Sequence, residues 1–351
     1  MQVIIARNVN DAVAKGARLM KHGAVRQASR AGPTLEYPEP VCTVYEHPME
    51  RVLFDAVRDC NPFFHLMESL WMLAGRNDVA WLSRFNKRME SYSDDGEVFN
   101  AAYGYRWRQQ FNCASGTSDQ LTSIAEMLRR DPDSRRAVLQ IWDAAADLGA
   151  NSKDLACNTQ AMFKVRDGHL NMTVSNRSND IIWGCYGANA VHFSFLLEYM
   201  AARIGVEPGV YRQMSDSYHA YMETWPKFEQ IAERFDRTGD PYDARRSDKV
   251  EVYPLVAVPD VFDAELRDWL ISDPEKITVE QWQRESNHGH WQNPFFGSVA
   301  TPMHNAWFAY KAKDVECARR WLDCCAASDW RRAGHEWLDR RMESARAARA
   351  A

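Results

Sequence analysis

A single cysteine, Cys157, lies in the stretch DLACNTQ (154–160), between small and polar residues and just before a run that alternates like a strand. A thiol at a strand entry is well placed to be partly exposed, and nearby cations stabilise its nucleophilic thiolate form. Arg135, Arg136 and Arg177 are the candidate cations. The alternative is a small buried core residue, which is the commoner fate of a free cysteine.

Three further clusters carry polar groups without a clear structural use. SRRA contains Arg135 and Arg136, whose side chains would point to opposite faces of a strand. Guanidinium forks match phosphate oxygens, so the two arginines serve one site only at a chain end or across a subunit boundary. The alternative is a solvated pair that forms salt bridges.

The second cluster is NRSND, in which Arg177, Ser178 and Asp180 follow a strand. An arginine and a serine together suit a phosphate, although a loop of turn-forming residues has the same composition. The third is YHAY, where His219 and Tyr221 share one face of a strand. They suit a sugar hydroxyl, or else form a buried histidine–tyrosine pair.

Metal chemistry is not expected from the sequence. None of the eight cysteines is spaced as C-x-x-C, the pattern typical of zinc sites. His288 and His290 form a His-x-His pair, but no third ligand stands at useful spacing. The N-terminus has no signal-peptide layout and no run reaches the ~18 apolar residues of a membrane span. We therefore expect reduced thiols in the cytoplasm, which is the host cytoplasm if a phage encodes the chain.

The composition is that of a folded globular protein with room for a sizeable core. Among 351 residues, 46% are hydrophobic and 26% are charged, and the net charge is −5. An acidic balance argues against duplex nucleic acid as a partner, and no membrane partner is expected. A local basic pocket for a small anion remains open.

The elements that must position these residues can be read from periodicity and turn signals. Helices are expected over 10–22 with Asn10 as N-cap, over 63–75 ending at Gly75, over 191–205, and in the C-terminal part, whose tail ESARAARA is expected to fray. Strands are expected over 41–45, over 135–143 and on both sides of Asp167-Gly168, a preferred hairpin pair. The irregular alternation predicts an α+β fold with a mixed, largely antiparallel sheet.

Nine segments in order, from about residue 10 to about residue 225, together resemble the thymidylate synthase family. They are SRAGPT, MESLWMLAG, YGYRW, DSRRAVLQIW, ACNTQAMFKV, NRSND, G…AN, EPG and HAY. The resemblance implies that a cysteine thiolate adds to C6 of a pyrimidine nucleotide and that C5 then takes one carbon from 5,10-methylenetetrahydrofolate. It also implies a single catalytic domain over 1–351, with 230–351 as a divergent part, and a homodimer built on a sheet face.

The resemblance assigns a role to each matching residue. Cys157 matches the nucleophile, Glu68 the acid that organises water and protons, and Tyr103 the tyrosine near the C5 proton. Substrate-binding positions are matched by Arg30, Arg177 and Ser178 for phosphate, Arg135 and Arg136 for the partner subunit's phosphate, His219 and Tyr221 for ribose, and Asn189 for the base. Cofactor-binding positions are matched by Asp180, Gly184 and Met89.

Four departures from the synthase pattern favour a hydroxymethylase. Asn158 replaces the histidine that usually follows the cysteine, and Asn179 gives RSND, as in phage hydroxymethylases of the family. Met89 and Tyr92 stand where two tryptophans are expected, and the closing C-terminal tail is not recognisable. Losing an indole wall and a lid weakens the exclusion of water, so water rather than hydride is expected to complete the reaction.

The expected base is uracil, because an asparagine amide complements N3–H and O4. This assignment requires a one-residue insertion within WGCYGAN; without it, Ala188 takes the place of Asn189. Ser178 and Arg135 match the pattern of 2′-deoxynucleotide enzymes, so dUMP is expected first. Three alternatives stay open: a dCMP or CMP hydroxymethylase, a synthase that makes dTMP, and a nucleotide-binding homologue without turnover.

Overall fold

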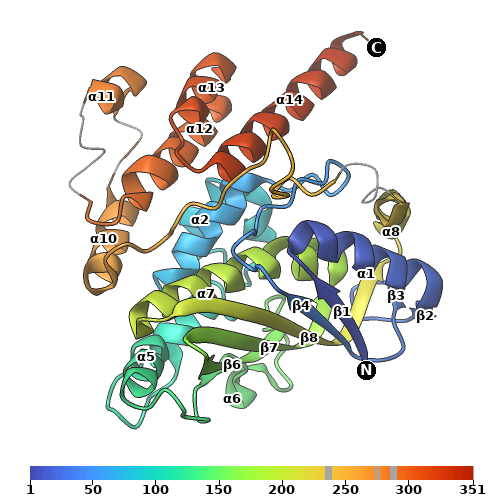
Figure 1. Cartoon of the computed structure of the whole chain (residues 1–351). Coiled ribbons are helices and arrows are strands. Elements are labelled where there is room, and N and C mark those ends of the chain that lie inside the picture. The colour runs from blue at the N-terminus through green and yellow to red at the C-terminus, as the bar shows by residue number, and fades with distance from the viewer. Residues whose placement is uncertain (234–238, 273, 275–276, 285–290, 351) are drawn as a thin grey trace.

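One mixed β-sheet carries the fold, and helices α1 (Val9–Gly23), α2 (Pro62–Leu73) and α7 (Ala190–Ile204) lie along one side of it (Figure 1). The computed structural model describes residues 1–233, 239–272, 274, 277–284 and 291–350. None of the helices within these residues is long and apolar enough to cross a membrane.

The sheet has the order β1-β4-β8-β7-β6-β5, with β3 also paired to β8 and β2 to β3. Its strands are β1 (Gln2–Ala6), β2 (Val25–Gln27), β3 (Thr34–Glu36), β4 (Val41–Tyr45), β5 (Val138–Gln140), β6 (Asn158–Arg166), β7 (His169–Asp180) and β8 (Glu207–Tyr221). β1 is parallel to β4 and β7 to β8, whereas the other pairings of these strands are antiparallel. The prediction of a mixed, largely antiparallel sheet is confirmed.

The other described helical elements range in length from three to 23 residues. In the first half of the chain these are α3 (Val79–Ser83), η1 (Lys87–Tyr92), α4 (Tyr103–Tyr105), η2 (Arg106–Gln110), α5 (Gln120–Arg130) and α6 (Ala144–Asp147). Later in the chain follow η3 (Ile181–Asn189), α8 (Trp225–Phe228), η4 (Glu229–Glu233), α10 (Pro259–Ile271), α11 (Val279–Arg284), η6 (Phe296–Ala300), α12 (Thr301–Lys311), α13 (Val315–Asp323) and α14 (Ser328–Ala350).

The hairpin that leads to the candidate site follows from its turn residues. Asp167 and Gly168 have φ values of 51° and 74°, so both adopt the left-handed conformation that a two-residue turn of this type requires. The turn fixes the register of β6 against β7 as far as Gln160, opposite Ser175, and an irregularity between Asn158 and Gln160 then places Asn158 opposite Asn176. The predicted hairpin is confirmed, and it brings the start of β6 to the end of β7.

Three local predictions need correction. Helix α1 begins one residue earlier than expected, and Asn8 rather than Asn10 is its N-cap, accepting hydrogen bonds from the N–H groups of Asn10 and Asp11. The strand expected over 135–143 is only β5, because Arg135 and Arg136 lie in irregular backbone before it. The tail expected to fray continues α14 to Ala350, because alanine and arginine favour helix.

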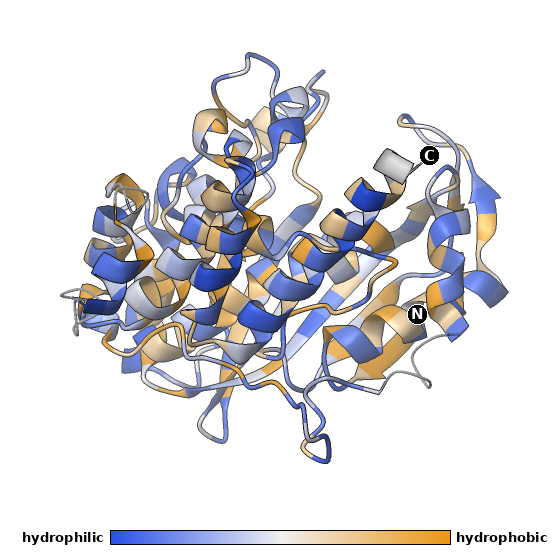
Figure 2. Ribbon diagram, turned by 90° about the horizontal axis from the view of Figure 1, so that it is seen from above, coloured by the Kyte–Doolittle hydropathy of each residue, from blue (hydrophilic) through white to orange (hydrophobic). Residues whose placement is uncertain are grey.

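The C-terminal helices pack on the elements that carry the candidate site. Phe63 of α2 contacts Trp307 of α12 and Trp337 of α14, at centroid distances of 5.8 and 5.6 Å. Seen from above, these helices carry hydrophobic and hydrophilic stripes side by side, as amphipathic helices do (Figure 2). α10 is tied to α7 by Asp263, which accepts hydrogen bonds from Tyr199 and Arg203.

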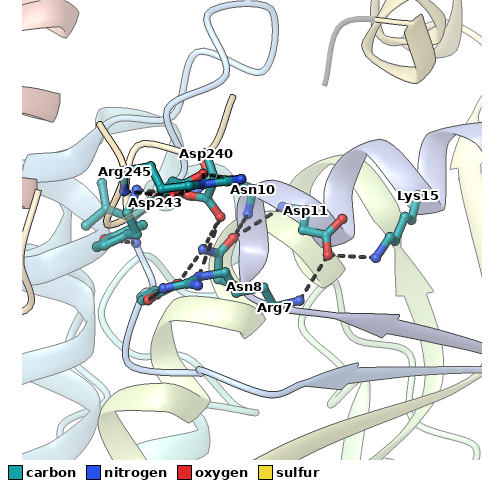
Figure 3. Close-up of polar contacts among 11 residues, drawn as sticks. Arg7, Asn8, Asn10, Asp11, Lys15, Asp240, Asp243 and Arg245 are labelled. Atoms are coloured by element: carbon teal, nitrogen blue, oxygen red, sulfur yellow. Dashed lines mark hydrogen bonds and ion pairs between the residues drawn. The ribbon is translucent and has the colours of Figure 1, made fainter. Parts of the chain in front are cut away.

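A second polar network joins the segment after residue 239 to the start of α1 (Figure 3). The Asn8 amide donates to Asp240 and to Glu50, both at 2.6 Å. Arg7 pairs with Glu50 at 2.6 Å. Asn8 is fully buried, so these contacts satisfy a side chain whose burial would otherwise be costly.

The buried carboxyl of Asp329, at the start of α14, makes stability depend on pH. It accepts hydrogen bonds from the Tyr242 hydroxyl at 3.0 Å and from the Trp330 N–H at 2.8 Å. Burial raises its pKa to about 6, whereas an unfolded aspartate titrates near 3.9. The folded state therefore binds the proton more tightly, and the free energy of unfolding falls as the pH rises between these two values.

We expect Asp329→Asn to remove this penalty. The free energy of unfolding of the variant relative to the wild type should increase by about 3 kcal/mol between about pH 4 and pH 7, which is two pKa units of linkage. Urea unfolding of both proteins across this range measures the difference. A difference that does not change with pH would contradict the role given to Asp329.

Candidate active site

Cys157 lies where β6 begins, beside the end of β7. Its carbonyl accepts the Arg177 N–H at 3.0 Å, and its own N–H donates to the Tyr103 hydroxyl at 3.3 Å. The Arg177 guanidinium donates from Nε to the Ala156 carbonyl at 2.8 Å and lies over the Trp142 ring at 5.4 Å. These contacts hold a cation and a phenol on either side of a partly exposed thiol.

The charges around Cys157 oppose the effect of its burial without cancelling it. Burial raises the pKa of the thiol, while Arg177 and, more weakly, Arg30 lower it. Asp154 and Asp180 add to the rise. Because the net pKa is raised, the resting group is a thiol, and its proton must leave as the sulfur attacks.

The arginines expected at a phosphate fall into two groups. Arg30 is exposed and donates to the Ser152 carbonyl at 3.2 Å, which brings it within electrostatic reach of Cys157, near Arg177. Arg135 and Arg136 are also exposed, ahead of the edge strand β5. Within the residues described, their side chains form no hydrogen bond or ion pair.

The pair expected at a ribose lies at the end of β8. The rings of His219 and Tyr221 meet edge to face, with centroids 5.6 Å apart. His219 Nδ1 lies 3.2 Å from the Ser217 hydroxyl, which donates to Glu36. These contacts orient the His219 ring. Burial raises the pKa of Tyr221, and Asp180 and Cys157 add to this rise. The pair therefore shares an electrostatic environment with the thiol.

A chain of amides runs behind Cys157. The Asn158 amide donates to Asn189 Oδ1 at 3.4 Å, the Asn189 amide donates to Asn179 Oδ1 at 3.1 Å, and the Asn179 amide donates to the Ser215 hydroxyl at 2.9 Å. All four side chains are buried. One neighbour thus donates to the Asn189 carbonyl and another accepts from its amino group, which fixes the orientation of this amide.

The backbone before Asn189 has wider turns than an α-helix, as the expected insertion would require. η3 is a π-helix, whose wider turns accommodate one extra residue and which often occurs at functional sites. Asn189 is its last residue and points at Asn158 and Asn179, while Ala188 is held beside it. Asn189 is the one of the two with these side-chain hydrogen bonds, and its assignment to a base stays a prediction.

A cavity of about 200 Å³ opens beside this amide chain. Glu68, Met89, Tyr103 and Asn189 line it, as expected of residues that share a site. Tyr92, at the second expected tryptophan position, is 44% exposed and is not among the lining residues. The remaining lining residues are Trp71, Met72, Leu82, Phe99, Ala101, Ala102, Asp154, Ala188 and His192.

Several of these lining residues were not predicted, and two of them, Asp154 and His192, carry titratable side chains. Asp154 accepts the Ala101 N–H at 2.8 Å, and burial raises its pKa. His192 lies 3.0 Å from Glu68. His192 could have been identified from its spacing, because it follows Asn189 by three residues and a helix places both side chains on one face.

Asp180 and Gly184 border the same amide chain. One oxygen of Asp180 caps η3 by accepting the N–H groups of Ile182 and Trp183, and the other is buried without a hydrogen-bond partner in the described chain. Burial raises the pKa of this carboxyl. A Cβ at Gly184 would lie 3.0 Å from Asn179 Oδ1 and 3.5 Å from Asn189 Nδ2, so a side chain there would crowd the amides.

The described residues hold no group of three or more metal-ligating side chains. His288 and His290 lie outside the described residues.

Comparison with known proteins places these observations in a family. The profile of the thymidylate synthase family matches residues 21–273. The deoxyuridylate hydroxymethyltransferase of Pseudomonas phage M6 is 48% identical over 364 aligned residues, covering all of this chain and 98% of that protein. The deoxyuridylate hydroxymethyltransferase of Bacillus phage SP01 is 42% identical over 200 residues, 55% of this chain and 52% of that protein. A putative thymidylate synthase of Methanosarcina acetivorans is 30% identical over 240 residues, 66% of this chain and 94% of that protein.

Proposed function

The chain belongs to the thymidylate synthase family, and on this basis we propose that it is a folate-dependent hydroxymethylase that converts dUMP to its 5-hydroxymethyl derivative. The observation that carries the proposal is the full-length similarity to a phage deoxyuridylate hydroxymethyltransferase. Two arrangements support it: Arg177 lies beside Cys157, and Asn189 lines a cavity together with Tyr103, whose hydroxyl accepts the Cys157 N–H.

Cys157 starts the reaction by forming a bond from sulfur to C6 of the pyrimidine, which makes C5 nucleophilic and divides a difficult substitution into easier steps. Arg177 beside the thiol stabilises the thiolate as its proton leaves. The Tyr103 hydroxyl, held at the Cys157 N–H, is placed to accept or pass on the C5 proton.

The phosphate is bound by Arg30, Arg177 and Ser178, with Arg135 and Arg136 supplied by a partner subunit. Helices cover one side of the sheet, whereas Met162 of β6 and Met214 of β8 are half-buried on strands next to β7. Pairing of this open face would form a homodimer. Arg135 and Arg136 precede edge strand β5, free of contacts within the described chain, where an interface would use them.

His219 and Tyr221 bind the ribose, and Asn189 reads the base. With its orientation fixed by Asn158 and Asn179, Asn189 keeps one N–H for O4 of uracil and one lone pair for N3–H. Cytosine presents the opposite pattern at these two atoms. The fixed amide therefore favours dUMP over dCMP.

Methylenetetrahydrofolate supplies the single carbon when it is bound. Two features suit it: Met89, Trp71 and Phe99 give the cavity an apolar wall, and Asp180, next to Asn179 of the amide chain, offers a buried oxygen that lacks a hydrogen-bond partner in the described chain. An N–H donor of a pterin would satisfy that oxygen. Gly184 leaves room for a ring against the amide chain. These residues orient the co-substrate above C5.

Residues 230–351 are part of the same domain in this proposal. Their helices pack behind α2, which carries Glu68, and α10 anchors α7, which carries His192. Their role is to hold the far wall of the cavity in place.

The open wall at Met89 lets water reach the reactive carbon. We expect Met89→Trp to narrow the cavity and slow the addition of water, lowering the ratio of hydroxymethyl product to tritium released from 5-³H-dUMP by roughly tenfold, or about 1.4 kcal/mol in barrier height. Tyr92→Trp is the matched control, because Tyr92 is exposed and is not among the lining residues. An unchanged ratio in a folded Met89→Trp variant would contradict the role of this wall.

Incubation with 5-³H-dUMP and 5-³H-dCMP in turn, each with methylenetetrahydrofolate, tests the substrate, and CMP is tested by product analysis. We expect rapid tritium release from dUMP and slow release from dCMP. Faster release from dCMP would reverse the base assignment. Tight binding of nucleotide without release from either would indicate a homologue that binds without turnover.

A further inference from the structure

A buried acid–imidazole pair lines the cavity. Glu68 comes from α2 and His192 from α7, and their facing atoms, Oε2 and Nε2, lie 3.0 Å apart. The side chains are only 13% and 4% exposed. Both residues line the cavity together with Asn189.

Neither facing atom has another use in the described chain. Glu68 Oε2 and His192 Nε2 are both fully buried, and each lacks a well-aligned hydrogen-bond partner. Buried polar atoms are normally satisfied, and leaving one unsatisfied costs about 1–3 kcal/mol. A misaligned pair that faces a cavity is therefore poorly explained by stability, whereas catalytic hydrogen bonds are often long or poorly aligned before the substrate binds.

We propose that His192 is a positioning residue that orients the Glu68 carboxylate to take a proton from the water that completes the reaction. The inference rests on the proposed hydroxymethylase function. His192 Nε2 faces Oε2 of Glu68. The other carboxylate oxygen, Oε1, is left for a water molecule in the cavity.

The step balances without a further reactant. Once C5 has lost its proton and tetrahydrofolate has left by cleavage of its nitrogen–carbon bond, the pyrimidine carries an electrophilic exocyclic methylene and is still bound to Cys157 through C6. The water oxygen forms a bond to the methylene carbon, and the water proton passes to Glu68. The electron pair moves towards C5, the C5–C6 double bond re-forms, and the C6–S bond breaks to release Cys157. No oxidant or reductant is consumed.

Other titratable residues lie near the pair formed by Glu68 and His192. His65 of α2 lies with its ring centroid 6.4 Å from that of His192, and burial and Arg58 hold its pKa well below the usual value. Tyr103 and Asp154 face the same cavity, and burial raises the pKa of both. His65 is therefore neutral near pH 7 and is not among the lining residues, which makes it a matched control.

The test is His192→Gln, compared with His65→Gln, in the full-length enzyme with dUMP and methylenetetrahydrofolate. Tritium release from C5 precedes the addition of water, and the hydroxymethyl product follows it. We expect His192→Gln to lower the ratio of product to tritium released at least tenfold. A covalent nucleotide adduct on Cys157 should accumulate, visible by intact-protein mass spectrometry and released by an added thiol as a 5-thioether product.

An unchanged ratio in His192→Gln, or an equal fall in His65→Gln, would overturn the inference. Adding His192→Gln to Glu68→Gln should lower product formation no further, because the two residues act as one unit; additive losses would count against it. If His192→Gln does not fold, His192→Asn carries the same test. Failure of this inference differs from failure of the proposed function. If the wild-type enzyme forms no hydroxymethyl product, the proposed function itself is refuted.

Discussion

Replacing Cys157 with serine is expected to lower tritium release from 5-³H-dUMP by at least about 10⁴-fold, the scale of loss when a covalent nucleophile is removed. A serine hydroxyl keeps the size of the thiol but is a far weaker nucleophile, and Arg177 cannot make it ionise near pH 7. Cys113→Ser is the matched control, because Cys113 is also partly exposed but lies in a separate turn, where its backbone pairs with Gly116 and Thr117.

The measurement is tritium release at saturating methylenetetrahydrofolate for the wild type and both variants. Binding of dUMP should persist in Cys157→Ser, since the phosphate and ribose contacts remain. A serine variant that keeps more than a tenth of the wild-type rate would show that Cys157 is not the nucleophile.

Replacing Asn189 with aspartate is expected to reverse the preference between dUMP and dCMP. A carboxyl group accepts from the cytosine amine and, when protonated, donates to N3, whereas the amide complements O4 and N3–H of uracil. Each mismatched buried polar contact costs about 1–3 kcal/mol, so the ratio of kcat/KM values should change by at least about 10²-fold.

Asn171→Asp provides the control for this substitution. Asn171 lies on the same strand as Asn179 but near the hairpin end, and its side-chain oxygen accepts the Val210 N–H at 3.0 Å, a contact that aspartate keeps. The preference for dUMP should not change there. An Asn189→Asp variant that still prefers dUMP would show that another residue reads the base.

Local chemistry made much of the scaffold predictable. The Asp167-Gly168 turn and the alternating runs beside it define β6 and β7, and positive φ at Gly75 and Gly205 ends two helices as expected. The N-cap of α1 was misplaced because Asn8 and Asn10 are equally good capping residues in sequence. Only their tertiary contacts, Asn8 to Asp240 and Asn10 to the Val52 carbonyl, assign the roles.

Site residues that belong to a recognisable motif could be predicted from the sequence. Contacts that arise from tertiary packing could not. Cys157, Arg177 and Asn189 belong to recognisable segments. Arg177 lies beside Cys157, and Asn189 lines a cavity with Tyr103, which contacts the Cys157 N–H. The pairing of Glu68 with His192 joins helices separated by more than a hundred residues. Asn158 drew attention only as a substitution, and its hydrogen bond to Asn189 depends on the π-helical turn before α7.

The identity of the product tests the central claim most directly. Wild-type enzyme, dUMP and methylenetetrahydrofolate are incubated together, and the nucleotide and folate products are identified by mass spectrometry, with the reaction repeated in ¹⁸O-water. The account predicts a 5-hydroxymethyl nucleotide whose new oxygen comes from water, together with tetrahydrofolate. A 5-methyl nucleotide formed with dihydrofolate would contradict it and identify the enzyme as a synthase.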